Sequence, residues 1–179
     1  MTEKEEFVII LDYLPYGYPM ERKGLPLAQA IGIKTFALLE LVPRKGIILA
    51  PKEKVYIGAE KRDKIYYIAG RLPREKLTET SKLQLQEFIE AVVVEREEEF
   101  IGFFNNAQAI NTRLHQIELL PGFGKKHTHE LLEARKEHIF ESFGDIRERV
   151  KNIADPRKAI EKRLMEELLE RQRFNLFVK

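Results

Sequence analysis

The sequence contains no cysteine, so it can form neither a disulfide nor a thiolate metal site. It also lacks tryptophan, and no apolar run is long enough to span a bilayer. The first residues, Met-Thr-Glu-Lys-Glu-Glu, do not follow the pattern of a signal peptide. We therefore expect a soluble cytoplasmic protein that does not associate with membranes.

The sequence patterns of common cofactor and catalytic sites are absent as well. No P-loop, no dinucleotide-binding glycine pattern and no nucleophile elbow occurs. Of the four histidines, His127 and His129 would face different ways on a helix, and no glutamate stands in the spacing of a metalloprotease. We therefore expect no cofactor and no metal site.

The charges are nearly balanced but unevenly placed. Net charge is +2, with 13 basic and 10 acidic side chains in residues 1–75, 3 and 7 in residues 76–111, and 15 and 12 in residues 112–179. Two mildly basic ends joined by an acidic middle indicate two modules and a bridging helix. The 44% hydrophobic content can supply one ordinary core or two small ones.

Five short apolar segments, each bounded by glycine, proline or charged residues, predict β-strands in the first module. They are residues 7–11, 25–31, 35–42, 54–57 and 64–69. Five strands in a module of this size suit a small five-stranded barrel of the OB type, whose open face and loops often bind single strands.

Two groups of tyrosines in this module lie near basic residues. The first group follows the first strand and comprises Tyr13, Tyr16, Tyr18, Arg22 and Lys23. The second lies on later strands and comprises Tyr56, Tyr66, Tyr67, Lys61, Arg62 and Lys64. Such groups can stack unpaired bases, but tyrosines also cap barrel cores, and both roles stay open. We take Tyr16, Arg22 and Lys23 as candidate nucleic-acid contacts.

The hydrophobic period changes after residue 75. Apolar residues recur at helical spacing and are Leu85, Phe88, Ile89, Val92 and Val93. The acidic run at residues 95–99 is most simply a solvated helix face. Residues 76–110 are therefore predicted to form an acidic linker helix region.

The stretch Leu119-Leu120-Pro121-Gly122-Phe123-Gly124-Lys125-Lys126 is the most informative part of the chain. Upstream apolar residues recur at spacing three, and an apolar pair follows downstream, so we expect a helix, a tight hairpin and a second helix. The upstream residues are Leu114, Ile117 and Leu120, and the downstream residues are Leu131, Leu132 and Arg135. Glycine suits the hairpin because it allows positive φ and close backbone approach.

This hairpin has the features of a phosphate site. We expect the amides of Gly122, Gly124 and His127 to face outward at the positive end of the second helix. Lys125 and Lys126 add charge there, and the predicted nucleic-acid site also includes Phe123 and Arg135.

The stretch resembles the hairpin of the helix-hairpin-helix family of non-sequence-specific DNA and RNA binders. That family has apolar-Pro-Gly-apolar-Gly, three variable residues, a small residue and an apolar pair; here the small position is Thr128. The resemblance implies a monovalent cation on the carbonyls of Glu118, Leu120 and Phe123. An ordinary glycine turn between helices is the alternative.

A wider resemblance covers nearly the whole chain. The segments at 8–17, 36–43, 55–58, 61–65 and 112–122 resemble the archaeal domain-of-unknown-function family 655. That resemblance implies nucleotide or nucleic-acid binding, an archaeal cytoplasmic origin, and an OB-like part followed by a helix-hairpin-helix part.

We therefore expect an α+β protein with three parts. Residues 1–75 form a small five-stranded OB-like β-barrel, residues 76–110 an acidic linker helix region, and residues 111–179 an all-α tandem helix-hairpin-helix domain. In the last part, residues 151–158 take the place of a degenerate second hairpin. The alternating apolar tail at residues 174–178 is expected to pair with the barrel edge or pack on the linker helix.

The function expected from these features is that of a non-catalytic nucleic-acid-binding accessory protein. It would grip the backbone of DNA or RNA, with the ribosome or transcription components as further partners. The alternative is a protein-interaction module of the archaeal translation or transcription machinery. A remote alternative is a DNA glycosylase or lyase, because Lys126 resembles in position the catalytic lysine of some DNA glycosylases that share this hairpin. The catalytic aspartate that this resemblance implies would fall on Gly144, and the nearest acid is Asp145.

Overall fold

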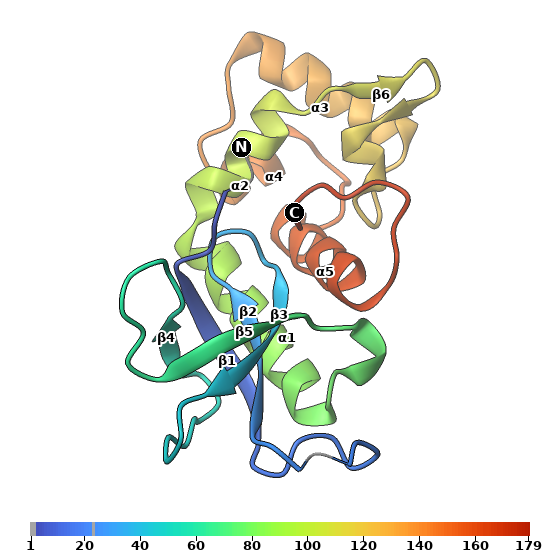
Figure 1. Cartoon of the computed structure of the whole chain (residues 1–179). Coiled ribbons are helices and arrows are strands. Elements are labelled where there is room, and N and C mark those ends of the chain that lie inside the picture. Colours follow the sequence, from blue (N-terminus) through green and yellow to red (C-terminus); the bar gives the residue numbers. More distant parts are fainter. Residues whose placement is uncertain (1–2, 23) are drawn as a thin grey trace. The chain divides into compact units, whose positions relative to one another are not determined.

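The structure is a computed structural model that describes residues 3–22 and 24–179 (Figure 1). The chain divides into two compact units. The first contains the residues up to Glu87 together with Leu168–Lys179, and we call it the sheet unit. The second contains Phe88–Glu167, and we call it the helical unit.

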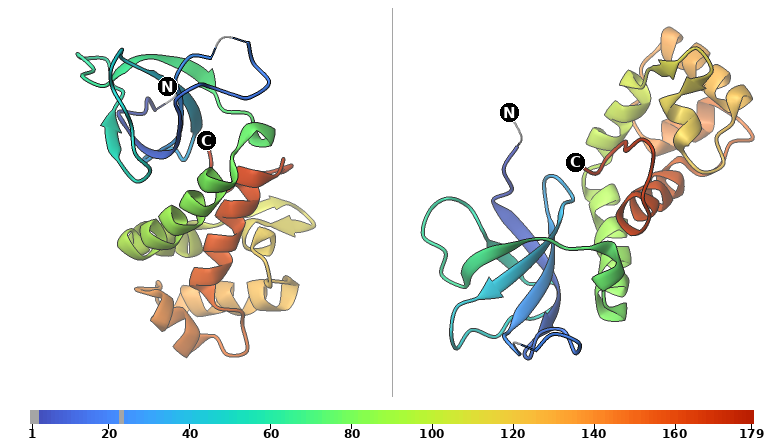
Figure 2. Two further views of the ribbon diagram at one scale, coloured as in Figure 1. Left: turned by 90° about the horizontal axis from the view of Figure 1, so that it is seen from below. Right: turned by 45° about the vertical axis from the view of Figure 1, so that its right-hand side comes forward.

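The five strands expected from the sequence are all present in the sheet unit. They are β1 (Phe7–Leu14), β2 (Leu27–Gly32), β3 (Leu38–Pro43), β4 (Lys54–Tyr56) and β5 (Ile65–Arg71). They pair antiparallel in the order β4-β1-β2-β3-β5. The sheet curls into a half-barrel, which Figure 2 shows from two sides.

The expected OB-like barrel is wrong, because the sheet does not close. β4 and β5 are the two edges, and no strand pairing joins them within residues 3–22 and 24–179. β4 has only three residues, and the pairing of β5 with β3 is irregular at two places. Neither edge therefore offers the other a long regular ladder.

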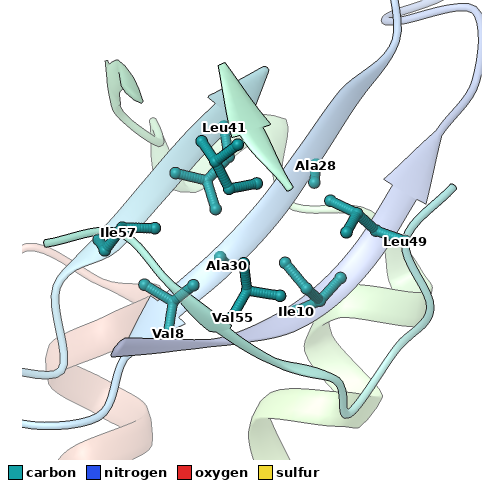
Figure 3. Packing of buried hydrophobic residues seen from close by; sticks show 9 residues of the cluster. Val8, Ile10, Ala28, Ala30, Leu41, Leu49, Val55 and Ile57 are labelled. Carbon is teal, nitrogen blue, oxygen red and sulfur yellow. The ribbon is translucent and has the colours of Figure 1, made fainter. Parts of the chain in front are cut away.

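The core of the sheet unit is built from alternating residues of the strands (Figure 3). Val8 and Ile10 of β1, and Ala28 and Ala30 of β2, lie two apart and are fully buried. Residues two apart on a strand share a face, so one face of the sheet carries this cluster. Leu49 and other apolar residues complete it from the connecting segments.

The buried Gln29 of β2 ties the sheet to the segment that follows it. Its four partners are the Tyr18 hydroxyl, the Lys76 carbonyl, the Thr78 amide and the Ser81 hydroxyl, at 2.6 to 3.1 Å. These bonds fix a 3-10 helix, η1 (Arg74–Lys76), and the start of α1 (Glu79–Glu95) against strand β2 within the sheet unit. A buried amide with every bond made stabilises one arrangement of these elements.

The last residues of the chain belong to the sheet unit but form no strand there. The backbone amide of Lys179 donates to the Thr35 carbonyl at 3.2 Å, and its ammonium lies 3.0 Å from a Glu3 carboxylate oxygen. The tail therefore ends at the turn between β2 and β3 instead of extending the sheet as a strand.

The helical unit holds one ribbon and several short helices. Its elements are the second half of α1, from Phe88, then α2 (Glu97–Asn106), β6 (Ala109–Asn111), β7 (Leu114–His115), the 3-10 helix η2 (Gln116–Leu119), α3 (Lys125–Glu137), α4 (Phe143–Arg149) and most of α5 (Pro156–Leu169). β6 and β7 pair antiparallel. The buried side chains of this unit include Phe104, Ile117, Leu131, Phe140 and Ile146.

The expected all-α tandem helix-hairpin-helix domain is also wrong. The unit contains the β6-β7 sheet, and a four-residue 3-10 helix stands where the first α-helix of the hairpin was expected. Of the three residues at spacing three, Leu114 lies in β7, Ile117 lies in η2 and Leu120 is its C-cap, so their spacing does not mark an α-helix. The expected second hairpin is a turn without glycine before α5, with Asn152 at φ 59°.

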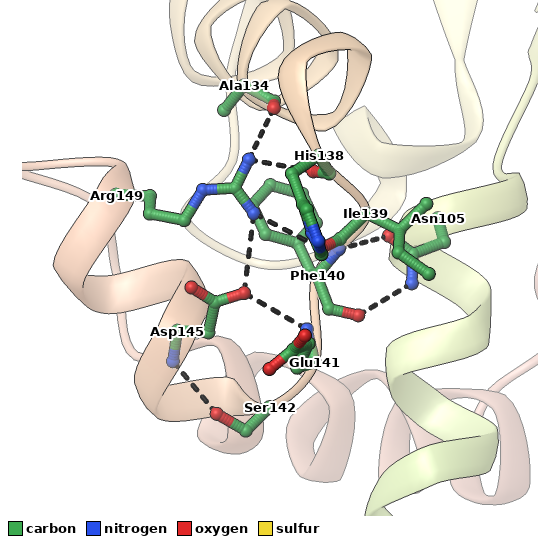
Figure 4. A network of polar contacts seen from close by, with 9 residues as sticks. All are labelled: Asn105, Ala134, His138, Ile139, Phe140, Glu141, Ser142, Asp145 and Arg149. Carbon is green, nitrogen blue, oxygen red and sulfur yellow. Dashed lines mark hydrogen bonds and ion pairs between the residues drawn. The ribbon is translucent and has the colours of Figure 1, made fainter.

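Side-chain caps hold the connection between α3 and α4 (Figure 4). The Arg149 guanidinium donates to the carbonyls of Ala134 at 2.5 Å and His138 at 2.7 Å, near the end of α3. Asn105 of α2 bonds both the amide and the carbonyl of Phe140. These bonds satisfy backbone groups that a helix end leaves open.

Candidate functional site

The predicted hairpin begins with a capped 3-10 helix. His115 precedes η2, and its Nδ1 accepts a hydrogen bond from the Ile117 amide at 3.2 Å. The Glu118 carboxylate accepts in return from the His115 amide at 2.7 Å. This reciprocal pair is a capping box that fixes the chain before the turn. The sequence interpretation missed this role of His115.

The glycine turn, residues 121–124, is anchored by Phe123. This side chain is buried, and its ring centroid lies 6.2 Å from that of Phe104. Gly122 has φ of +85°, and a Cβ added there would come within 2.9 Å of the Ala154 Cβ. Both the backbone conformation and the space therefore require glycine at position 122.

Gly124 has no such structural requirement. It is the N-cap of α3, with φ −100° and ψ −170°, a region open to any residue. A Cβ added at Gly124 would meet no atom within 4 Å. No side chain caps the helix at this residue, so its backbone stays exposed at the start of α3.

The first turn of α3 carries a row of free donors. The amides of Gly124, Lys125, Lys126 and His127 find no acceptor within the described residues. α3 has no acidic residue in this turn, and the helix is thirteen residues long. Unpaired amides at the positive end of a helix favour an anion.

The two lysines of this turn differ in their contacts. The Lys125 ammonium lies 2.5 Å from the Arg113 carbonyl and 3.0 Å from the Glu118 carboxylate. Burial acts to raise the pKa of Glu118, but the bonds from Lys125 and from the His115 amide outweigh it and leave this pKa lowered. The Lys126 side chain is exposed and has no partner in the part of the chain that the structure describes. Lys126 is therefore the cation available to a ligand.

Two further residues of the turn region, Thr128 and His127, pack against the turn. The buried Thr128 donates its hydroxyl to the Gly124 carbonyl at 2.9 Å, which explains how threonine occupies the small position. The His127 ring lies edge-on to Phe123, 6.3 Å away, and its buried Nδ1 has no partner among the described residues.

Arg135 is directed toward the fold. Its Nη1 donates to the carbonyls of Phe104 and Ala107 at 3.0 and 2.9 Å, at the end of α2. Burial lowers the pKa of this guanidinium. Arg135 therefore caps α2, and we do not count it among the phosphate contacts proposed below.

The candidate residues of the sheet unit lie in the connection between β1 and β2. Tyr16 is 79% exposed, and Arg22 is exposed as well. Lys23 lies outside the described residues. Tyr18 of the same loop has its hydroxyl bonded to Glu40 and Gln29, and burial raises its pKa to about 12. Tyr18 is therefore structural, and Tyr16 is the ring in this loop that a ligand can reach.

The side chains considered for metal binding are not clustered among the described residues, and the carboxylate considered for glycosylase chemistry is already hydrogen-bonded. No group of three or more histidine, aspartate or glutamate side chains in the described residues could hold a metal ion. The Asp145 carboxylate accepts from the Glu141 amide at 3.0 Å and from Arg149 at 3.3 Å. For the monovalent cation expected on hairpin carbonyls, the Leu120 carbonyl already accepts from the Phe123 amide at 3.1 Å. That cation stays a prediction.

Comparison with known proteins identifies relatives of this chain. A family model described as "Protein of unknown function (DUF655)" matches residues 4–179. The "Uncharacterized protein MJ0038" of Methanocaldococcus jannaschii is 39% identical over 177 residues, which cover 98% of this chain and 80% of that protein. The crystal structure of Af1531 from Archaeoglobus fulgidus has a TM-score of 0.83 and 40% identity, covering 98% of this chain and 100% of that one.

The length and apolar character of the helices show whether any of them could span a membrane. Within residues 3–22 and 24–179, none is both long enough and apolar enough to cross a bilayer.

Proposed function

Because this chain belongs to the family described as "Protein of unknown function (DUF655)", whose description names no activity, we propose a function from the geometry of its own site. The protein is a non-catalytic accessory protein of the archaeal cytoplasm that binds nucleic acid. It holds a backbone phosphate at the glycine turn and the first turn of α3.

One observation carries this proposal: four consecutive amides, from Gly124 to His127, have no acceptor within the described residues. They lie at the positive end of a helix, beside Lys126, whose ammonium has no partner among the residues that the structure describes. A phosphate oxygen is an anionic acceptor that such donors bind well. Because Gly124 has no side chain, the ligand can approach the backbone closely.

A site of this kind contacts the sugar-phosphate backbone and not the bases. Phosphate contacts fix the position of a nucleic acid without carrying sequence information. We therefore propose binding of DNA or RNA without sequence preference, and affinity that falls with salt as counterions are released. Tyr16 and Arg22 of the sheet unit supply a second contact in this proposal.

The proposal is tested by a substitution that keeps the helix capped. Aspartate is a favoured N-cap residue, and the space beside Gly124 is open, so Gly124→Asp should fold normally. Its carboxylate would occupy the free amides and repel phosphate. In fluorescence anisotropy with a labelled oligonucleotide duplex, we expect this variant to lose binding while its urea unfolding midpoint is unchanged or higher.

A pair of lysine variants adds a matched measurement. Lys126→Ala should reduce the slope of log K against log salt by about one, because one phosphate contact is removed. Lys162, an exposed lysine of α5, serves as the control, and Lys162→Ala should leave the slope unchanged. Wild-type affinity in folded Gly124→Asp, together with an unchanged slope in Lys126→Ala, would reject the glycine turn as the phosphate site.

A different face of α3 favours the alternative, a protein-interaction module. A cleft of about 470 Å³ is lined by Glu130, Glu133 and Glu137 on α3 and by Arg149 and Lys151 beyond it. The three carboxylates would repel a phosphate backbone, whereas a basic segment of a protein partner would suit them. A Glu130→Lys, Glu137→Lys variant that loses a copurifying protein and keeps oligonucleotide binding would support this second role.

A further inference from the structure

Two neighbouring tyrosines on β5 have an arrangement that a regular strand does not give. Successive side chains of a strand point to opposite faces of the sheet. The rings of Tyr66 and Tyr67 nevertheless lie with centroids 5.5 Å apart and planes at 71°. The two rings are therefore neighbours at one place on the surface.

A β-bulge accounts for this arrangement. Val42 of β3 pairs with Tyr67, and the next residue, Pro43, pairs with Ile65. Tyr66 is thus the extra residue between two paired positions, and the register shifts there. A bulge bends a strand and re-aims side chains, and bulges are common at sheet edges and beside functional sites.

Both rings are open to a ligand. Tyr66 is 65% exposed and Tyr67 is 46% exposed, and β5 is an edge of the sheet. Neither hydroxyl has a hydrogen-bond partner among the described residues, in contrast to Tyr18 and Tyr56, whose hydroxyls are bonded. The fold therefore uses no polar contact to hold these two rings in place.

The segment that carries this ring pair is basic in sequence, and one of its cations, Lys64, is ion-paired with Glu53. The segment 61–71, which includes β5, carries four basic side chains and one acidic side chain. The neighbouring end of β3 continues into Arg44 and Lys45, and the Arg44 amide donates to the Lys64 carbonyl at 2.8 Å beside the tyrosines. Arg71, at the other end of the strand, is exposed and has no partner within the described residues.

We propose that Tyr66 and Tyr67 form a stacking platform for the unpaired bases of a single-stranded nucleic acid. Exposed rings bordered by cations suit a ligand that presents flat bases and negative phosphates together. An uncharged peptide strand could use the same edge, but it would gain nothing from the basic border. The platform is independent of the glycine turn, which contacts only backbone phosphates and accepts duplex as well as single strands.

The test compares substitutions at the platform. A fluorescein-labelled oligo(dT) of about twelve nucleotides matches the length that such surfaces bind, and a dT·dA duplex of equal length is the comparison. We expect the single strand to bind the wild-type chain more tightly than the duplex. Tyr66→Ala, Tyr67→Ala should weaken single-strand binding by about 5-fold to 100-fold. Duplex binding should change little.

Two controls separate stacking from loss of structure. Tyr66→Phe, Tyr67→Phe keeps the rings and should keep the affinity. Leu83→Ala removes an apolar side chain of α1 that is 68% exposed, and should also bind as wild type does. Since the chain has six tyrosines and no tryptophan, quenching of tyrosine emission by oligo(dT) reports stacking directly, and it should be smaller in the alanine variant.

Three results would overturn the platform. They are no binding of oligo(dT) by the wild type, unchanged binding in the folded alanine variant, or loss of binding in the phenylalanine variant. The glycine-turn proposal fails separately, through Gly124→Asp and Lys126→Ala measured on duplex. Loss of single-strand binding in the alanine variant beside an unaffected Gly124→Asp variant would support the platform and reject the turn.

Discussion

Gly122 lies against Ala154, so closely that a Cβ added to the glycine would come within 2.9 Å of the alanine Cβ. This contact joins the glycine turn to the connection before α5. It also separates the two glycines of the turn, because Gly124 faces open space. One glycine is required by the fold, and the other leaves backbone exposed.

The same substitution at the two positions should therefore have opposite effects on stability. Gly122→Ser forces a side chain into positive φ and against Ala154, and should lower the free energy of unfolding by about 1–2 kcal/mol or more. Gly124→Ser introduces a favoured N-cap residue into open space and should stabilise slightly. Urea unfolding of both variants checks this. Equal destabilisation of the two would contradict the assigned roles.

The capping histidine predicts a dependence of stability on pH. Burial, followed by the charge of Arg135, lowers the pKa of His115 below its ordinary value of 6.5. The fold therefore favours the neutral ring, whose Nδ1 accepts from Ile117. Its contribution is complete above pH 6.5 and is lost as the pH falls below that value toward the lowered pKa.

His115→Asn is the test of this dependence. Asparagine can cap a helix but does not titrate, so the difference in unfolding free energy between pH 7.5 and pH 5.5 should shrink in this variant. The exposed His129 provides the control, and His129→Asn should keep the wild-type difference. A difference that is the same in all three proteins would remove His115 from this role.

Arg149 should contribute to stability through the carbonyls that it caps. Arg149→Met removes bonds to Ala134 and His138 and leaves these acceptors near the end of α3 without a donor. We expect a loss of about 1.5–3 kcal/mol, the range for hydrogen bonds that involve a charged group. Amide exchange in the last turn of α3 should rise as well. Arg149→Lys should restore little, since an ammonium lacks the planar fork of donors.

The ion pair of Arg163 and Glu167 is buried in α5. Nε of Arg163 lies 3.0 Å from the Glu167 carboxylate, and its Nη1 donates to the Leu119 carbonyl just before the glycine turn. Glu167→Gln removes the nearer carboxylate of this buried guanidinium and leaves Glu166, 4.0 Å from Nη1, so it should cost up to about 3–5 kcal/mol. Arg163→Met, Glu167→Leu should cost less than that single change. Thermal unfolding of the two variants shows which of them loses more stability.

The sequence predicted the elements whose ends are marked by nearby residues. The five strands are bounded by glycine, proline and charged residues, and each appears near its expected place. Closure of the sheet could not be predicted, because it depends on whether β4 and β5 meet. The bulge at Tyr66 is equally invisible in the sequence, since it arises from pairing with Val42 and Pro43.

The candidate site was located from the sequence, but the roles of its residues were not. Apolar residues three apart before the turn are compatible with an α-helix and with a 3-10 helix. In the structure, His115 caps a 3-10 helix there. Arg135 and Lys125 carry the charge expected of phosphate ligands, but both donate to backbone carbonyls instead. The carbonyl bonded by Arg135 is 28 residues away in sequence, and that bonded by Lys125 is 12 residues away. Such long-range partners leave no local pattern.

The return of residues 168–179 to the sheet unit has a consequence for how the chain folds during synthesis. The helical unit is a continuous segment, whereas the sheet unit is interrupted by it. On the ribosome, the helical unit can complete its contacts first, because all its residues emerge before the tail. The sheet unit is synthesised first, but its contacts of Lys179 with Thr35 and Glu3 can form only after the tail has emerged. It therefore completes its contacts after the helical unit does.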